Sequence, residues 1–233
     1  MKITVIIPTL DEQDIVPKAI RSAQRGNADQ IIVCDGGSKD NTIQVATELN
    51  CQVIQSSAGR GKQMASGAAH ADGDILLFLH ADCELTSGCL DQIRENVSEA
   101  MDAVNGNQPE RYPWGCFMHR IDADGWQFRW LEKGNHWRAR KRGLVYGDQA
   151  LWVHRDTYKQ VGGFPDVPLM EDVKVSDRLK KLTKPLVLAG PVTISARHWQ
   201  RRGVFWTTIR NQVLLAMYRF GLSAERVAEL YRR

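Results

Sequence analysis

Short, mostly apolar runs alternate with amphipathic stretches along about the first ninety residues of this chain. Such runs are typical of strands covered on both faces, and apolar residues every three to four positions are typical of helices. The pattern predicts strands at residues 3–7, 30–34, 52–55 and 75–79 and helices at residues 14–25, 39–50 and 63–70. Strands and helices that alternate in this way favour an α/β fold with a parallel, doubly wound sheet and right-handed crossovers.

The second half of the chain has a less regular pattern. It predicts helices at residues 87–101, 124–142 and 170–182, a turn at 105–110, and strands at 114–121 and 146–154, the last followed by a short helix ending at Gly162-Gly163. Two short strands fit within residues 185–196, and the chain closes with a helix over residues 205–220 and a short tail helix. No internal repeat or low-complexity linker interrupts this pattern.

Polar and acidic side chains follow the predicted strands at the point where each strand ends. The first strand is followed by Pro8-Thr9-Leu10-Asp11-Glu12, the second by Asp35-Gly36-Gly37-Ser38, and the fourth by His80-Ala81-Asp82. Because the carboxyl ends of parallel strands meet at one edge of an open sheet, we expect these groups to lie together. Acids beside the basic, glycine-rich segment Gly59-Arg60-Gly61-Lys62 indicate a site for a metal ion, a nucleotide and a diphosphate.

Two of these segments contain a pair of glycines. The glycines after Asp35 let the backbone approach a ligand, and Asp35 can accept a hydrogen bond from a base imide or a ribose hydroxyl. The same segment is compatible with a tight turn in which Ser38 or Asp40 caps the next helix. The Gly59–Lys62 segment combines backbone donors, two cations and a helix start, which predicts an anion site. It matches neither the P-loop nor the GxGxxG fingerprint, which disfavours an ATPase and a dehydrogenase.

Asp82 is the predicted metal ligand, because Mg²⁺ and Mn²⁺ prefer carboxylate and diphosphate oxygens. His80 could add a nitrogen ligand, although a role in capping the pocket or bonding the backbone is slightly favoured. His198 is a further candidate ligand, and it belongs to a basic segment that either closes over the phosphates or is a solvated loop, namely Arg197, His198, Arg201 and Arg202.

Glu171 and Asp172 form a paired acid at the start of the predicted helix over residues 170–182. Asp172 is the best candidate for a general base, because removing a proton from a hydroxyl group needs a positioned carboxylate. The alternative is that both acids only stabilise the positive end of the helix dipole.

Composition narrows the class of protein. The net charge of +4 is too small to predict nucleic-acid binding by itself. The five cysteines include no CxxC pair, so the sequence indicates neither a zinc site nor a disulfide framework, and a reducing compartment fits. The first apolar run is too short for a secretory signal, and no stretch approaches the roughly 20 apolar residues of a membrane span. We therefore expect a cytoplasmic protein.

Taken in order, the motifs resemble those of family 2 glycosyltransferases with the glycosyltransferase A fold. The matching segments extend from Lys2 to about Trp206 and are VIIPTLDE, IIVCDGGSKDNT, GRGKQMASGA, GDILLFLHAD, YGDQALWV, GGFPD and LMEDV. The tail ARHWQRRGVFWTTIRNQVLLAMYRFG and the GRGKQM–LHAD pairing resemble a narrower subgroup, labelled arsenosugar-biosynthesis glycosyltransferases. The resemblance implies one domain over residues 1–233, with a nucleotide-binding half (1–100), an acceptor-side half (101–203) and C-terminal helices (204–233).

The resemblance also implies an inverting transfer of a sugar from a nucleoside-diphosphate donor, with uridine the favoured nucleoside. Asp35 matches the acid that contacts the uracil or ribose, Asp82 the last acid of the metal-binding DxD motif, and Asp172 the catalytic base, with Glu171 beside it. The positions at which further nucleotide contacts are expected are Pro8, Leu10, Glu12, Arg60 and Lys62. Two departures are visible: the usual DDGS is DGGS, and His80 replaces the first DxD acid.

The sequence leaves the acceptor open between a small molecule and a lipid. Trp114, Trp126, Trp130, Trp137 and the Gly147–Gln149 turn are expected on its side, with core packing predicted for at least half of the tryptophans. For the apolar positions of residues 204–220, core packing is the first explanation, a lipid acceptor or contact with the inner face of the membrane the second, and a homodimer interface the third.

Two other classes of protein remain as alternatives. A nucleotidyltransferase also uses a basic glycine-rich loop and an acid-bound metal, but that loop normally follows the first strand rather than the third. A non-catalytic module that binds a nucleotide sugar or a lipid would keep the fold, although the retained Asp82 and Asp172 disfavour it.

Overall fold

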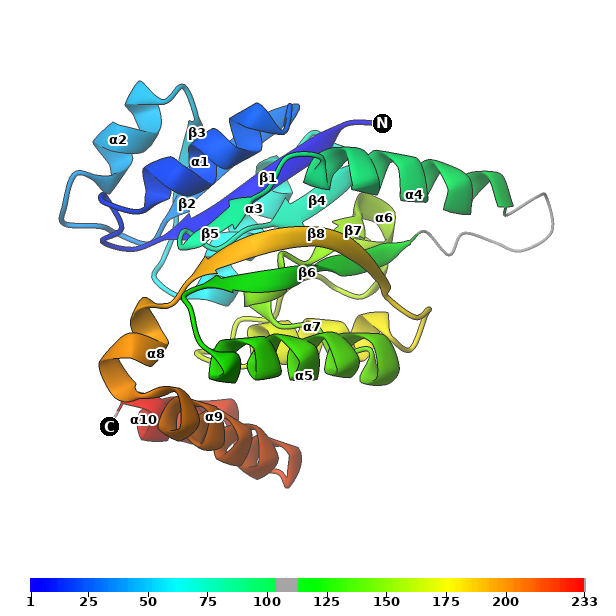
Figure 1. Cartoon of the computed structure of the whole chain (residues 1–233). Coiled ribbons are helices and arrows are strands. Elements are labelled where there is room, and N and C mark those ends of the chain that lie inside the picture. The colour runs from blue at the N-terminus through cyan, green and yellow to red at the C-terminus, as the bar shows by residue number, and fades with distance from the viewer. Residues whose placement is uncertain (104–112, 233) are drawn as a thin grey trace.

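The computed structural model describes residues 1–103 and 113–232, so the turn expected at residues 105–110 lies outside the described residues (Figure 1). The strands are β1 (Ile3–Thr9), β2 (Gln30–Asp35), β3 (Gln52–Gln55), β4 (Ile75–Phe78), β5 (Cys83–Leu85), β6 (Trp114–Asp122), β7 (Trp152–His154) and β8 (Leu186–Ser195). The helices are α1 (Val16–Arg25), α2 (Thr42–Glu48), α3 (Arg60–His70), α4 (Cys89–Ala103), α5 (Trp126–Arg142), the 3-10 turn η1 (Gly147–Gln149), α6 (Arg155–Gln160), α7 (Glu171–Leu179), α8 (Arg197–Arg202), α9 (Val204–Arg219) and α10 (Ala224–Arg232).

The strands form one sheet in the order β3-β2-β1-β4-β7-β6-β8-β5. Strands β3, β2, β1 and β4 run parallel, and so do β6 and β8, whereas β7 and β5 are antiparallel to their neighbours. Thr9 pairs with Asp35, so the loops that follow β1 and β2 begin side by side. The prediction of an α/β fold around a mostly parallel sheet is confirmed.

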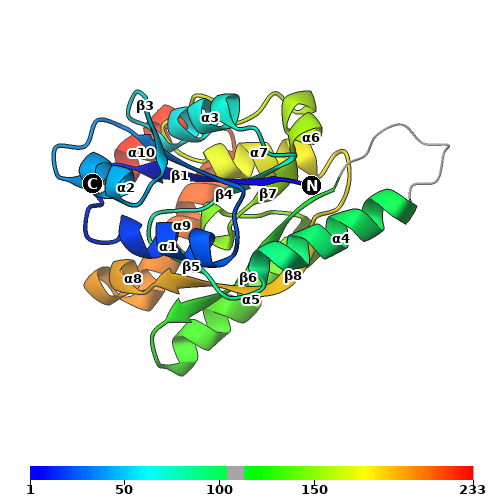
Figure 2. The ribbon, with the colours of Figure 1, turned by 90° about the horizontal axis from the view of Figure 1, so that it is seen from above.

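The sheet has a separate apolar layer on each face. Successive residues of β1 point to opposite sides: Val5 packs in a cluster with Ile20 of α1, and Ile6 in a cluster with Met64 of α3 and Val175 of α7. Each such side chain contributes about 1.5–3 kcal/mol when it is fully buried. Figure 2 shows α1 and α4 on one side of the sheet and α3, α6 and α7 on the other.

Several predicted elements have to be corrected. Residues 146–154 were expected to form one strand, but the first part is the turn η1 and only Trp152–His154 form β7. The two short strands expected at 185–196 are the single strand β8, which passes through Gly190-Pro191 where its pairing with β6 shifts register. The sequence pattern predicts neither β5 nor α8. Strand β5 has three residues and pairs with the distant β8, and α8 has six residues.

The tryptophans lie differently from the prediction. Trp114 is fully buried, whereas Trp126, Trp130 and Trp137 of α5 are 71%, 61% and 52% exposed. The prediction that at least half of them pack in the core is therefore wrong. Core packing was also the first explanation for the apolar positions of α9, and it is wrong too: Leu214 is buried, but most of the large apolar side chains of that helix are exposed.

Candidate functional site

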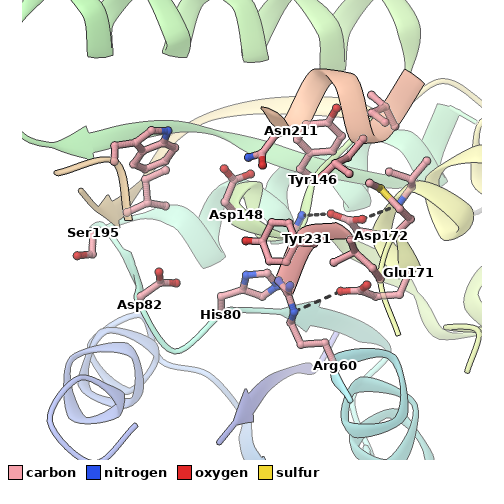
Figure 3. Close-up of a pocket in the computed structure, with 18 residues that line it drawn as sticks. Arg60, His80, Asp82, Tyr146, Asp148, Glu171, Asp172, Ser195, Asn211 and Tyr231 are labelled. Carbon is pink, nitrogen blue, oxygen red and sulfur yellow. Dashed lines mark hydrogen bonds and ion pairs between the residues drawn. The ribbon is translucent and has the colours of Figure 1, made fainter. Parts of the chain in front are cut away.

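A cavity of about 330 Å³ lies at the end of β4, between the sheet and helices α7, α9 and α10 (Figure 3). Five of the residues that the sequence predicts for donor binding or catalysis line it, namely Arg60, His80, Asp82, Glu171 and Asp172, and the turn expected on the acceptor side contributes Gly147 and Asp148. The five come from the first turn of α3, the loop after β4 and the first turn of α7. The fold thus brings together charged groups from three segments that are far apart in the chain.

Asp172 is held in place by backbone hydrogen bonds. The Gly147 N–H donates to Oδ2 at 3.0 Å, and the Val173 N–H donates to Oδ1 at 2.7 Å. Burial raises the pKa of Asp172 above its ordinary value, while the Gly147 hydrogen bond and the positive charge of Arg60 act in the opposite direction. A fixed carboxylate with a raised pKa is a stronger base than an ordinary aspartate, which suits removal of a proton from a hydroxyl group.

Arg60 connects α3 to the start of α7. Its Nε lies 3.5 Å from Oε1 of Glu171, whose side chain is almost completely buried. Burial raises the pKa of Glu171, and the Arg60 charge opposes this shift. The helix start is held close by Gly61, where an added Cβ would lie 2.4 Å from the carbonyl oxygen of Pro165. Arg60 is therefore positioned to meet an anion at the cavity.

The His80 ring packs against the turn that holds Asp172. An added Cβ on Gly147 would lie 2.3 Å from His80 Nε2, which has no hydrogen-bond partner among the described residues. Burial, followed by the charge of Arg60, lowers the pKa of His80 to about 4, so the ring is neutral near pH 7. The Gly147 backbone covers Nε2, which favours the packing role for His80 over a metal ligand.

The cavity has an excess of negative charge. Its lining acids are Asp82, Asp148, Glu171 and Asp172, and Arg60 is the one lysine or arginine among the described lining residues. Asp148 has an Oδ1 that is buried without a hydrogen-bond partner among those residues, and burial raises its pKa. A diphosphate would be repelled here unless a cation accompanied it.

The donor atoms suit a hard divalent cation only in part. Across residues 1–103 and 113–232, no group of three or more His, Cys, Asp or Glu side chains could hold a metal ion by itself. Mg²⁺, however, is commonly bound through one or two carboxylates together with substrate phosphates and waters. Asp82 and the unpartnered oxygen of Asp148 therefore fit an ion that arrives with a diphosphate.

The Asp35 carboxylate stabilises the turn that follows β2. It is fully buried, and its Oδ2 accepts hydrogen bonds from the N–H groups of Gly37 and Ser38, each at 2.8 Å. Its Oδ1 accepts a short bond from the Ser38 hydroxyl. The carboxylate shapes the loop after β2 and does not line the cavity.

The other predicted donor contacts also lie outside the cavity lining. The Glu12 carboxylate lies 4.0 Å from the Arg197 guanidinium, and burial, followed by the charge of Asp82, raises the pKa of Glu12. Lys62 pairs with Asp166 at 3.4 Å, with both groups largely exposed. Pro8 is buried and Leu10 is exposed at the end of β1. The side chain of His198 lies outside the described residues.

Sequence reasoning missed several groups at this site. Gln63 is buried, and its Nε2 donates to the carbonyl oxygens of Thr9 at 2.6 Å and Cys34 at 2.8 Å, which ties β1 to β2. Asn211 of α9 and Tyr231 of α10 line the far wall of the cavity (Figure 3). Their positions depend on how α9 and α10 fold back over the cavity, and no local pattern in the sequence predicts that arrangement.

Comparison with protein families gives a match over most of the chain. The model for glycosyl transferase family 2 matches residues 4–159. A GalNAc(5)-diNAcBac-PP-undecaprenol β-1,3-glucosyltransferase of Campylobacter jejuni is 32% identical over 119 residues, which make up 46% of this chain and 38% of that protein. The chain spans less than half the length of the first curated relatives it matches.

Solved structures share the fold. Staphylococcus aureus TarS 1–349 in complex with UDP-GlcNAc has a TM-score of 0.61 at 15% identity, covering 84% of this chain and 58% of that one. Glucosyl-3-phosphoglycerate synthase from Mycobacterium tuberculosis, in complex with Mn²⁺, UDP and glucosyl-3-phosphoglycerate, has a TM-score of 0.52 at 18% identity, covering 83% and 70%.

Proposed function

This chain belongs to glycosyl transferase family 2, and we propose that it transfers a sugar from a nucleoside-diphosphate sugar, a UDP-sugar, to a hydroxyl group of an acceptor. The UDP and UDP-GlcNAc bound in the neighbouring structures support uridine as the nucleoside. Family membership disfavours the nucleotidyltransferase alternative.

The observation that carries this proposal is the half-buried carboxylate of Asp172, which accepts two backbone hydrogen bonds at the cavity. Asp172 accepts the proton of the acceptor hydroxyl. The hydroxyl oxygen then forms a bond to the anomeric carbon as the bond from that carbon to the diphosphate breaks on the opposite face. The sugar is transferred with inversion, and the nucleoside diphosphate leaves with the electron pair. Glu171 orients the site through its ion pair with Arg60.

The leaving diphosphate needs positive charge around it. Arg60 supplies one cation at the cavity, and Lys62 lies on the outer side of the same helix turn. We propose that Asp82, with Asp148, holds Mg²⁺ or Mn²⁺ when the donor is bound. A bound divalent ion would neutralise charge that develops on the diphosphate oxygens. We propose that His80 packs against the turn that holds Asp172, and that the nucleoside lies against Pro8, Leu10, Glu12 and the loop that Asp35 shapes.

The acceptor enters from the side that α9 and α10 cover. A small molecule and a lipid-linked acceptor are both compatible with a cavity of this size. The undecaprenol-linked substrate in the name of the Campylobacter relative supports the lipid.

The test is the isosteric substitution Asp172→Asn. It removes the base while keeping the shape, so we expect UDP release from a UDP-sugar to fall roughly 10²–10⁴-fold, with the affinity for UDP unchanged. The matched control is Asp177→Asn, because Asp177 lies on the same helix but outside the cavity lining, where it pairs with Lys180 at 2.6 Å and with Arg219 of α9 at 3.2 Å. Equal loss of UDP binding and turnover in Asp172→Asn would contradict the assignment of a base.

A further inference from the structure

Helix α5 exposes three tryptophans in one row. At about 100° per residue along a helix, Trp126, Trp130 and Trp137 lie within roughly 40° of one another. The buried side chains of the helix, such as Phe128, lie on the opposite face. The row therefore points away from the core, and packing within the chain does not account for it.

Helix α9 continues this apolar surface. Trp206, Ile209 and Val213 follow one another at helical spacing and are 65%, 57% and 46% exposed. The rings of Trp126 and Phe205 lie 6.0 Å apart, so the exposed rows of the two helices meet at the N-terminal ends of α5 and α9. We call it the tryptophan surface and define it by Trp126, Trp130, Trp137, Phe205, Trp206 and Ile209.

The charge of these two helices is one-sided. Lysines and arginines number six on α5, of which Arg138 is buried, and two on α9, against a single acid, Glu132. Glu132 is buried and lies 3.1 Å from Arg129, so neither of these fully described helices exposes an acid. Lys133 and Arg140 are exposed among the tryptophans, and the Arg142 guanidinium lies 5.0 Å from the Trp137 ring centroid. Asp122 and Asp124 precede the first turn of α5, at the end far from this basic cluster.

We propose that the tryptophan surface attaches the protein to an anionic lipid bilayer. Tryptophan is enriched where the hydrocarbon of a bilayer meets its headgroups, and interleaved cations add attraction to anionic lipids. A second copy of the chain is a poorer occupant, because a two-fold interface sets the same patch against itself and would bring like cations together. No helix among the described residues is long and apolar enough to cross a membrane.

The attachment would also hold the cavity close to the bilayer. The opposite side of α9 contributes Asn211, Leu214 and Leu215 to the cavity lining. A bilayer on the tryptophan surface therefore lies one helix away from the candidate base, which suits an acceptor carried by a lipid. The attachment itself does not depend on the proposed transfer, because lipid binding requires neither donor nor acceptor.

The experiment is co-sedimentation of the whole chain with vesicles, without nucleotide. We expect binding to phosphatidylcholine vesicles containing phosphatidylglycerol, and weak binding to phosphatidylcholine alone. The double substitution Trp130→Ala/Trp206→Ala should weaken binding to anionic vesicles by about tenfold or more, and Lys133→Glu/Arg140→Glu should abolish the preference for anionic lipid. The control is Met101→Ala, which removes an exposed apolar side chain from α4.

Failure of wild type to sediment with anionic vesicles, or unchanged binding by the double tryptophan variant, would overturn the proposal. Circular dichroism and thermal unfolding establish that each variant is folded. Analytical ultracentrifugation adds a second readout: a dimer that the tryptophan substitutions dissociate, together with no vesicle binding, would assign the surface to a second copy instead.

Discussion

Replacing Gly147 with alanine is a precise perturbation of the proposed base. The glycine has no positive φ, so alanine is allowed by the backbone, and the effect of the change is steric. The new Cβ would lie 2.3 Å from His80 Nε2 and 2.4 Å from Cε1, whereas ordinary contacts begin near 3.4 Å. The ring and the turn must therefore separate by roughly 1.1 Å, the difference between 3.4 and 2.3 Å.

A movement of this size reaches the base directly. The Gly147 N–H donates to Asp172 Oδ2 at 3.0 Å, and whatever part of the separation the turn takes up, rather than the His80 ring, lengthens this contact toward the limit of hydrogen-bonding distance. A misplacement of about 1 Å at a catalytic group costs on the order of 10²-fold in rate. This hydrogen bond lowers the pKa of Asp172. Weakening it should therefore raise that pKa and move the acid limb of the pH profile to higher pH.

The assay is UDP release from a UDP-sugar, with UDP affinity measured in parallel. Gly134→Ala is the matched control, since Gly134 lies within α5 and an added Cβ there meets nothing within 4 Å. In a His80→Ala background the clash is gone, so Gly147→Ala should cost much less than it does in the wild type. Turnover within about twofold of wild type, with an unchanged pH profile, would show that the His80 ring alone absorbs the clash and that the Gly147 turn does not position the base.

Two further predictions concern the pKa of Asp172 and the hydrogen bonds of Gln63. The raised pKa of Asp172 means that the base becomes protonated, and turnover falls, as the pH drops through a value above the ordinary 3.8 of an aspartate; a kcat profile that stays flat down to pH 4 would contradict this. Gln63→Ala removes two buried hydrogen bonds between β1 and β2 and should lower the free energy of unfolding by about 2–3 kcal/mol, measured by urea denaturation. The control Gln44→Ala, which removes only an exposed bond to Glu48, should change it by less than about 0.5 kcal/mol, and equal effects of the two substitutions would show that the Gln63 bridge is not important.

The parallel half of the fold could be predicted because its signals are local. β1, β2 and β4 are mostly apolar runs that end at acids or turn residues, and the rule for parallel strands then places those ends at one edge. The pairing of β5 with β8 was not visible, because a three-residue strand gains its identity from a partner far along the chain.

The site shows the same division. The placement of Glu171 and Asp172 beside Arg60 follows from motif order once the fold is known. The arrival of Tyr231 from α10 and the bridge made by Gln63 depend on tertiary packing. The tryptophans of α5 illustrate a further limit: a helix with large side chains on both faces does not report, by composition alone, which face meets the core. The exposed row is recognised only when Phe128 and its neighbours are seen to fill the buried side.

In the proposed reaction, a nucleoside diphosphate binds this site together with a divalent ion held at Asp82. The most direct test is isothermal titration calorimetry of UDP and GDP, with and without Mn²⁺, on wild type and on Asp82→Ala. We predict that UDP binds more tightly than GDP, that Mn²⁺ strengthens the binding to wild type, and that Asp82→Ala loses this metal-dependent gain. Failure of wild type to bind either nucleotide, with or without Mn²⁺, would contradict the account and favour a module that binds another ligand.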